Sequence, residues 1–227
     1  MSPVIDGLER AGVTVLPPAR RGDVAALVAR CTPRTLVLVD GVFHQVLAVG
    51  HVELRDAIAA GWTVWGLSSM GAIRAREMQH MGMRGFGEVF SRFCEPGDFR
   101  DDEVTLLHTP GPEYRELSEP MVHLRVALDD LSARGAISSS QARDIRDHLL
   151  GRYFGDRTLA LFARLLRERG AEIEPDDRPG EVSWAGFDRY RIKCHDLIRF
   201  IDEVIAESRD ESRAKNGAES GAVNPPR

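Results

Sequence analysis

An alternation of short apolar runs with helical patterns constrains this chain more than any other feature. Thr35 to Val39 (TLVLV) is a continuous apolar run ending at Asp40-Gly41, typical of a strand buried on both faces of a parallel sheet. Helical patterns over Gly50 to Ala60 and Gly71 to His80 flank a second strand, Trp62 to Leu67. A β-α-β-α order favours parallel strands with right-handed crossovers. We therefore predict an α/β fold with a Rossmann-like, mostly parallel sheet and flanking helices.

Weaker patterns extend this core in both directions. Val13 to Leu16 is a strand candidate, Gly22 to Arg30 favours a helix, and the irregular stretch 81–117 holds a short strand candidate at Val104 to His108. From Ser118 onward the pattern is helical, so we expect an all-helical C-terminal part. Its expected helices are Met121 to Ala133, Ser138 to Leu150, Gly155 to Arg169 and Ser183 to Ser208.

These patterns divide the chain into three parts. An α/β core is predicted over residues 1–117 and a helical region over 118–208. The polar tail over 209–227 is predicted to be disordered, because its composition cannot bury a core.

Composition narrows the classes of function. The chain has 227 residues and a net charge of −5, which disfavours a general nucleic-acid binder. No run of about 18 apolar residues is present, so we expect no membrane span. Its three cysteines are far apart and form no C-x-x-C pair, which favours a reduced, cytoplasmic location. Lys193 and Lys215 are the only lysines, so lysine-based covalent catalysis is disfavoured.

The strongest local signal is a pair of serines between the second strand and the second helix. Ser68-Ser69-Met70-Gly71 places hydroxyls and free backbone N–H groups where open α/β sheets bind ligands, beside Asp40-Gly41. This resembles a nucleophile elbow, but Gly66 precedes Ser68 by two and Gly71 follows Ser69 by two, so each serine has half of the G-x-S-x-G spacing. The alternative interpretation is an ordinary serine N-cap, and spacing alone does not choose between the serines.

Four other side chains near this edge could contribute to chemistry. His51 opens a helix on the same side and could serve as a general base, or simply cap that helix. Glu53 is about 200° from it around the helix, so the two cannot form a helix-based metal pair. Arg74 and Glu77 share a helix face, either as an anion-binding arginine or as a surface ion pair.

Metal and nucleotide sites have little support. The run Asp101-Asp102-Glu103 could bind Mg²⁺ through oxygens, but such runs are more often solvated turns, and we predict no metal. No G-x-G-x-x-G or Walker motif is present.

Several motifs together resemble one known family. Asp40-Gly41-Val42-Phe43, His51-Val52-Glu53, the string S-M-G-A-I-R-A-x-E from Ser69 to Glu77, and Asp101-Asp102-Glu103-Val104 occur in this order. This arrangement resembles the core of the TfuA-like proteins and covers about Val13 to Leu128.

The resemblance implies a role in peptide backbone thioamidation. TfuA-like proteins are partners of YcaO enzymes, which use ATP to activate a peptide amide so that sulfur replaces its oxygen. The family member is thought to supply that sulfur by acting on a thiocarboxylated, ThiS-like carrier protein. The implied partners are therefore a YcaO protein, the carrier and, through YcaO, a precursor peptide. The chain itself is expected to need no cofactor.

Under this hypothesis the resemblance assigns roles to the candidate residues. Ser69 attacks the carrier thiocarboxylate, and the N–H groups of Met70 and Gly71 hold the oxyanion. His51 accepts the serine proton and is oriented by Glu53 or Asp40. Arg74 binds the thiocarboxylate, with Gly41 and Glu77 also on the substrate side.

Two other classes of function remain open. In one, the protein is a non-catalytic scaffold that docks the carrier and the YcaO protein. In the other, the helix N-terminus binds a nucleotide or a phosphate.

Overall fold

The computed structural model describes most of the chain between residues 12 and 205. The described residues are Leu8, 12–40, 47–97, 100–110, 115–171, Pro175–Asp176, Ser183–Trp184 and 186–205. Predictions for Gly41 and for the tail over 209–227 lie outside the described residues.

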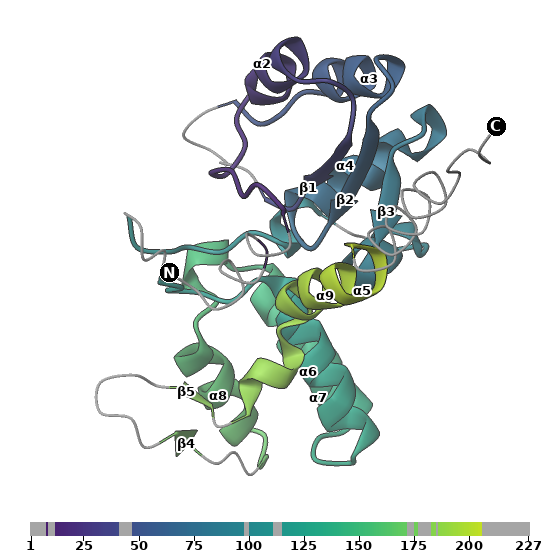
Figure 1. The fold of residues 1–227 in the computed structure, drawn as a ribbon. Coiled ribbons are helices and arrows are strands. Elements are labelled where there is room, and N and C mark those ends of the chain that lie inside the picture. The colour runs from purple at the N-terminus through teal and green to yellow at the C-terminus, as the bar shows by residue number, and fades with distance from the viewer. Residues whose placement is uncertain are drawn as a thin grey trace, which may run out of the picture.

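A three-stranded parallel sheet forms the centre of the first half (Figure 1). Its strands are β1 (Thr35–Leu38), β2 (Thr63–Leu67) and β3 (Arg84–Phe86), in the order β1-β2-β3. Gly66 of β2 pairs with Leu38 on one side and Gly85 on the other. This confirms the predicted α/β class and the parallel sheet.

Three helices complete the first core. Their bounds are α2 (Asp23–Arg30), α3 (His51–Ala59) and α4 (Met70–Met78), the last followed by the 3₁₀ turn η1 (Gln79–Met81). Helix α4 lies behind the sheet in Figure 1. Buried apolar side chains such as Leu54, Val64 and Met78 fill the space between helices and strands. Strands β1 and β2 are therefore fixed by packing on at least one face.

The second half has a separate apolar core. Helices α6 (Met121–Ala133), α7 (Ser139–Leu150) and α8 (Leu159–Arg167) enclose buried residues such as Leu124, Ile145 and Phe162. A short antiparallel pair, β4 (Pro175–Asp176) and β5 (Ser183–Trp184), is an addition to the predicted all-helical region. The 3₁₀ turn η3 (Phe154–Asp156) connects α7 to α8, and the 3₁₀ turn η4 (Phe187–Tyr190) follows β5.

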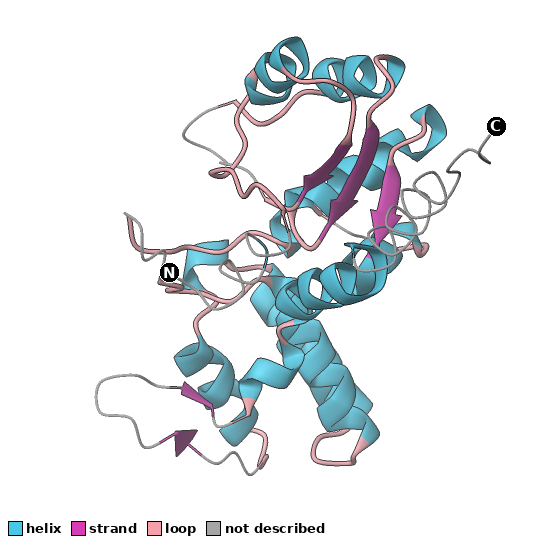
Figure 2. Ribbon diagram, in the orientation of Figure 1, coloured by secondary structure: helices cyan, strands magenta, loops and turns pink. Residues whose placement is uncertain are grey.

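Helix α9 (Ile192–Phe200) returns from the helical region to the sheet (Figure 1). Its last residue, Phe200, is buried and packs edge-on against Trp65 of β2 and Phe86 of β3. A five-residue π turn, Ile201–Ile205, follows. Figure 2 shows the strand arrows pointing toward this junction, so the carboxyl ends of the strands face the helical region.

The stretch 81–117 is more ordered than expected. It contains β3 and helix α5 (Gly87–Cys94), which the glycine-rich sequence did not reveal. Gly87 has a φ of 92°, and the carboxylate of Asp196 in α9 accepts hydrogen bonds from the next two N–H groups, of Glu88 and Val89. Helix α5 is thus capped by a side chain more than 100 residues away, which local sequence patterns cannot show.

Three other sequence predictions are wrong in detail. Val13 to Leu16 is not a strand, and Val15 and Leu16 are exposed. Val104 to His108 follows the 3₁₀ turn η2 (Asp101–Glu103) and makes only an isolated bridge, from His108 to Glu116. The final helix begins at Ile192 instead of Ser183, because Gly186 adopts a φ of 79° and η4 intervenes.

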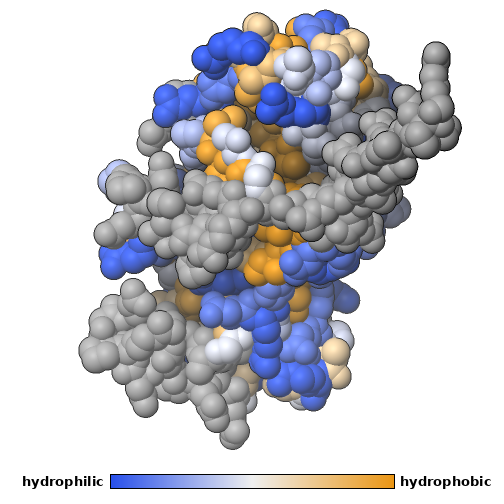
Figure 3. Space-filling view, viewed as in Figure 1, coloured by the Kyte–Doolittle hydropathy of each residue, from blue (hydrophilic) through white to orange (hydrophobic). Residues whose placement is uncertain are grey.

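Two surface observations complete the fold. None of the helices in the described part of the chain is both long enough and apolar enough to cross a membrane. Figure 3 shows apolar side chains in the middle of the face in view, with hydrophilic surface above and below.

Candidate functional site

The turn between β2 and α4 has a strained backbone. Ser68 has a φ of 64°, and it is the only non-glycine residue with a positive φ in the described part of the chain. This conformation costs free energy in L-residues and clusters at functional sites. Both serines of the turn are buried, with 2% of Ser68 and 4% of Ser69 exposed. The local geometry is therefore that of a sharp strand-to-helix elbow.

The two serines differ in their hydrogen bonds. The Ser68 hydroxyl donates to the backbone oxygen of Lys193 at 2.8 Å. The Ser69 hydroxyl makes no capping hydrogen bond to α4 and has no other hydrogen bond with a described residue. The ordinary N-cap interpretation therefore does not describe Ser69, and its hydroxyl is the available one of the pair.

The backbone N–H groups at the start of α4 also differ in whether they have an acceptor within the protein. Gly71 N–H donates to the Val39 oxygen at 3.2 Å, and Ala72 N–H donates to the Ser69 oxygen at 3.0 Å. The N–H of Met70 has no backbone acceptor among the described residues. The expected pair of oxyanion donors is therefore reduced to Met70.

Lys193, at the start of α9, lies against this turn. Its oxygen accepts from Ser68, and its ammonium group donates to the Val104 oxygen at 2.9 Å. Val104 packs in the same buried cluster as Ala72 and Ile73 of the first turn of α4. The sequence disfavoured lysine-based covalent catalysis, and nothing local indicated that a residue 125 positions downstream reaches Ser68.

A buried polar pair, with one member in α6 and the other just before it, supports the Lys193 segment. His123 and Glu119 are 2% and 3% exposed in their side chains, and His123 Nδ1 lies 3.0 Å from Glu119 Oε2. Burial lowers the pKa of His123 well below 6.5, and burial raises the pKa of Glu119 to about 6 against the opposing charge of Arg191. At neutral pH the imidazole is therefore neutral and the carboxyl group is ionised. Neither residue carries a sequence motif that would have indicated the site.

His51 belongs to a second, more exposed cluster. Its Nε2 lies 2.8 Å from Glu77 Oε2, and the same oxygen accepts from Arg74 at 2.6 Å. Arg74 Nε also donates to the Val49 oxygen at 3.0 Å. We call His51, Arg74 and Glu77 the α3–α4 cluster. Glu77 lies eight residues after Ser69, about 12 Å along a helix, so His51 is held away from the serine turn.

The expected partners of His51 are placed elsewhere. Glu53 is buried, and its carboxylate accepts backbone N–H bonds from Gly50 at 2.7 Å and Gly22 at 3.0 Å. It therefore caps α3 and fixes the start of α2, and Glu77 takes the place beside His51. Asp40 is exposed at the carboxyl end of β1, where its backbone oxygen accepts from Ala19 N–H.

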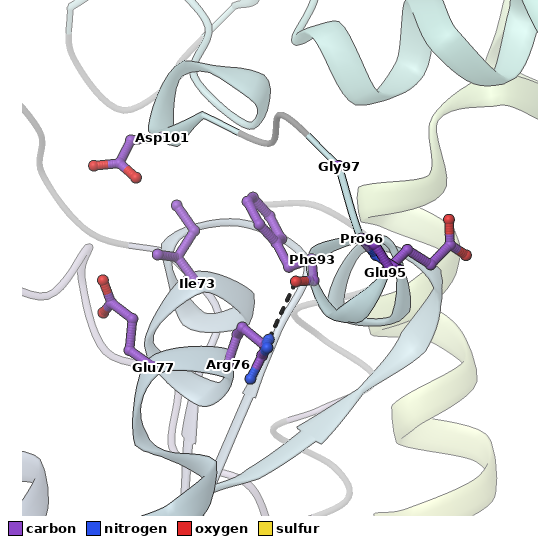
Figure 4. Close-up of a pocket in the computed structure, with 8 residues that line it drawn as sticks. All are labelled: Ile73, Arg76, Glu77, Phe93, Glu95, Pro96, Gly97 and Asp101. Atoms are coloured by element: carbon purple, nitrogen blue, oxygen red, sulfur yellow. Dashed lines mark hydrogen bonds between the residues drawn. The ribbon is translucent and has the colours of Figure 1, made fainter.

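A pocket of about 370 Å³ lies along α4 (Figure 4). Ile73 and Glu77 line it, and with Ser69 they are spaced four residues apart, so all three are on one side of the helix. Phe93, Pro96, Gly97 and Asp101 face them, and Arg76 Nε donates to the Phe93 oxygen. One side of α4 thus connects the serine turn, the pocket and the α3–α4 cluster.

The acidic run is engaged by arginines. Arg157, fully buried, binds Asp102, and Arg125 binds the buried Glu103. No group of three or more potential ligands suited to a metal ion is found among the residues that the structure describes. The carboxylates of Asp102 and Glu103 therefore fix helices in place.

Comparisons with known proteins identify the family of the chain. No curated protein matches the chain. A family model described as TfuA-like protein matches residues 40–158, which is 119 of the 227 residues. The match includes the serine turn, the α3–α4 cluster, Glu119 and His123. The chain therefore belongs to the TfuA-like protein family.

Proposed function

We propose that this protein is the sulfur-delivery partner of a YcaO enzyme and that it hydrolyses a thiocarboxylated, ThiS-like carrier protein. The observation that carries the proposal is the buried Ser69 hydroxyl, which has no described hydrogen-bond partner and sits on a strained turn at the start of α4. Family membership supports the sulfur chemistry. ATP is consumed by the YcaO partner, and this chain needs no cofactor.

The reaction is an acyl transfer through the serine. Ser69 Oγ attacks the thiocarboxylate carbon while its proton passes to a nearby base, and the developing oxyanion accepts from the Met70 N–H. The carbon–sulfur bond then breaks, so that sulfide leaves and the acyl group of the carrier remains on Ser69 as an ester. Water hydrolyses the ester, which releases the carrier as a carboxylate and restores the hydroxyl.

The Lys193 segment lies closer to the serine turn than His51 does, and we propose the Lys193 side chain as the proton acceptor. Lys193 is joined to the serine turn through its own carbonyl oxygen, whereas His51 Nε2 is bonded to Glu77, about two helical turns away. The Lys193 side-chain nitrogen donates to the Val104 oxygen, and Val104 packs in one buried cluster with Ala72 and Ile73 of the first turn of α4.

The carrier tail is proposed to lie along α4. An extended C-terminal tail that enters beside the α3–α4 cluster would follow the pocket toward Ser69, which lies about one helical turn before Ile73. Glu77 and Arg74 then contact the substrate, as the sequence suggested, and His51 helps to hold Glu77 in place. In this arrangement these residues affect the binding of the carrier more than the chemical step.

The decisive experiment compares the two serines. Purified thiocarboxylated carrier is incubated with wild type, Ser69→Ala or Ser68→Ala, and sulfide release is followed over time. Ser69→Ala should lower the rate at least about 1000-fold, because the nucleophile is gone. Ser68→Ala should lower it about tenfold, because it removes one hydrogen bond that holds Lys193.

A different pattern would favour the scaffold alternative. If Ser69→Ala releases sulfide at the wild-type rate, the serine is not a nucleophile. If that variant also supports thioamidation by the YcaO protein, while changes in the α3–α4 cluster abolish it, the protein docks its partners without chemistry.

A further inference from the structure

The pair His123–Glu119 stands out as a buried polar element that the proposed chemistry does not use. Both side chains are almost fully buried, in a position between α6 and α9 that apolar residues could fill. Buried polar groups destabilise the folded state unless each is hydrogen bonded. Their contacts therefore indicate what they are placed to hold.

The hydrogen bonds define the state of the imidazole. The N–H of Lys193 points at His123 Nε2 at 3.4 Å, so this nitrogen is an acceptor without a proton. The proton is then on Nδ1, which donates to Glu119 at 3.0 Å. Glu119 also accepts from Arg191 at 2.6 Å. This assignment requires a neutral His123, in agreement with the direction of its pKa.

These contacts fix three consecutive residues of the chain. The side chain of Arg191 is bound by Glu119 and Glu116, and Ile192 is buried. Lys193 is bound through both its backbone N–H and its backbone oxygen. His123 binds its N–H and Ser68 binds its oxygen. The first residues of a helix have no acceptors for their N–H groups within the helix. In the described residues His123 is the acceptor for the N–H of Lys193.

We propose that His123, oriented by Glu119, is a positioning residue that fixes Lys193 against the Ser68–Ser69 turn. This inference rests on the proposed function and adds a role for two residues that do not touch the substrate. It predicts that the placement of Lys193, and with it the chemical step, depends on an acceptor at the position of His123 Nε2.

The composition of the chain allows a direct test of placement. Lys193 and Lys215 are the only lysines, so ¹⁵N-lysine labelling gives two backbone amide signals, which Lys215→Arg assigns. His123→Leu keeps the volume of the side chain and removes the acceptor. We expect its Lys193 amide to exchange with solvent about tenfold faster than in wild type. His123→Gln, which restores an oxygen acceptor, should return exchange toward the wild-type rate.

Kinetics then separates positioning from folding. With thiocarboxylated carrier, His123→Leu should lower kcat about 100-fold with KM within twofold of wild type, since a small misplacement of a catalytic group has that effect. His123→Gln should recover most of kcat. His148→Leu, which changes an exposed histidine of α7, is the matched control and should behave as wild type.

The outcomes distinguish this inference from the proposed function. Wild-type exchange and wild-type kcat in His123→Leu would overturn the positioning role. If Ser69→Ala proves as fast as wild type, the proposed function fails, and amide exchange still tests whether His123 holds Lys193. Should His123→Leu not fold, Glu119→Gln serves as the second variant, because a neutral amide weakens the contacts with both His123 and Arg191.

Discussion

At the scale of single residues, two glycines set how closely α4 approaches the sheet. A Cβ on Gly66 would overlap the backbone oxygen of Gly71, and a Cβ on Gly71 would overlap the backbone oxygen of Leu38. This close approach lets Gly71 N–H reach Val39 and brings the serine turn against the end of β1. The glycines of the G-L-S-S-M-G segment therefore serve packing, and packing determines where Ser69 sits.

Replacing Gly71 tests this close contact. Gly71→Ala should lower the free energy of unfolding by about 3 kcal/mol, because the new methyl group meets backbone atoms that cannot move aside easily. Urea titration of the two proteins measures the difference. Gly97→Ala is the control, since a Cβ there has nothing within 4 Å, and it should change stability by no more than about 0.5 kcal/mol. Equal effects of the two changes would contradict the packing argument.

Candidate site residues could be predicted only where the local sequence determines the position of the side chain. The serine turn follows from a strand, small residues and a helix in sequence, so the turn could be proposed in advance, and the family resemblance then selected Ser69 over Ser68. Lys193 and His123 could not, because their relation to the turn depends on how α9 and α6 pack. Glu53 shows the opposite error: it lies beside His51 in sequence, yet its carboxylate binds backbone N–H groups.

At the scale of elements, the polar network between α6 and α9 couples stability to pH. Burial is the main cause that raises the pKa of Glu119 from 4.5 to about 6, so the folded state holds this proton more tightly than the unfolded state. That contribution is complete below pH 4.5 and is lost as pH rises through 6. His123 has the opposite sign, since its lowered pKa contributes stability that is lost as pH falls below 6.5.

Removing Glu119 from the network should change how stability depends on pH, because only the contribution of His123 then remains. Relative to wild type, Glu119→Gln should become more stable between pH 4.5 and pH 7 by up to about 2 kcal/mol, because the change deletes the contribution that falls with pH. Denaturant titrations at several pH values measure this difference. Glu168→Gln, at an exposed glutamate after α8, should show no trend. A flat difference for Glu119→Gln would contradict the raised pKa.

Element prediction succeeded where helices are defined by their own sequence. Helix α6 has the predicted bounds, and α7 begins after Ser138, whose hydroxyl accepts from Gln141 N–H. It failed for β3 and α5, where glycines at 82, 85 and 87 resemble a loop. There the cap comes from Asp196, and the neighbouring strand supplies the backbone hydrogen bonds. Such elements depend on tertiary contacts, which periodicity does not record.

At the scale of the whole molecule, α9 joins the two cores. A third buried cluster contains Ala72 and Ile73 from α4, Val122 from α6 and Ile192 from α9. Phe200 then anchors the far end of α9 on the sheet. The candidate site therefore lies at the junction of the two cores, with Ser69 at the start of α4 and His123 in α6.

The anchor can be tested separately from the site. Phe200→Ala should lower the free energy of unfolding by about 3 kcal/mol, since it removes a buried ring packed against two aromatic neighbours. Thermal and urea unfolding measure the loss. Ile198→Ala, an exposed position of the same helix, should lower it by less than about 1 kcal/mol. If both variants are equally stable, α9 is not anchored through Phe200.

The distance in sequence between Ser68 and Lys193 has a consequence for the newly made protein. At about 5–20 residues per second, a ribosome adds Lys193 roughly 6 to 25 seconds after Ser68, because 125 positions separate them. During that interval the sheet and α4 can form, but the residue that completes the turn has not yet been synthesised. A nascent chain therefore carries its serine without its lysine, and under the proposed function it gains activity only after translation has passed α9.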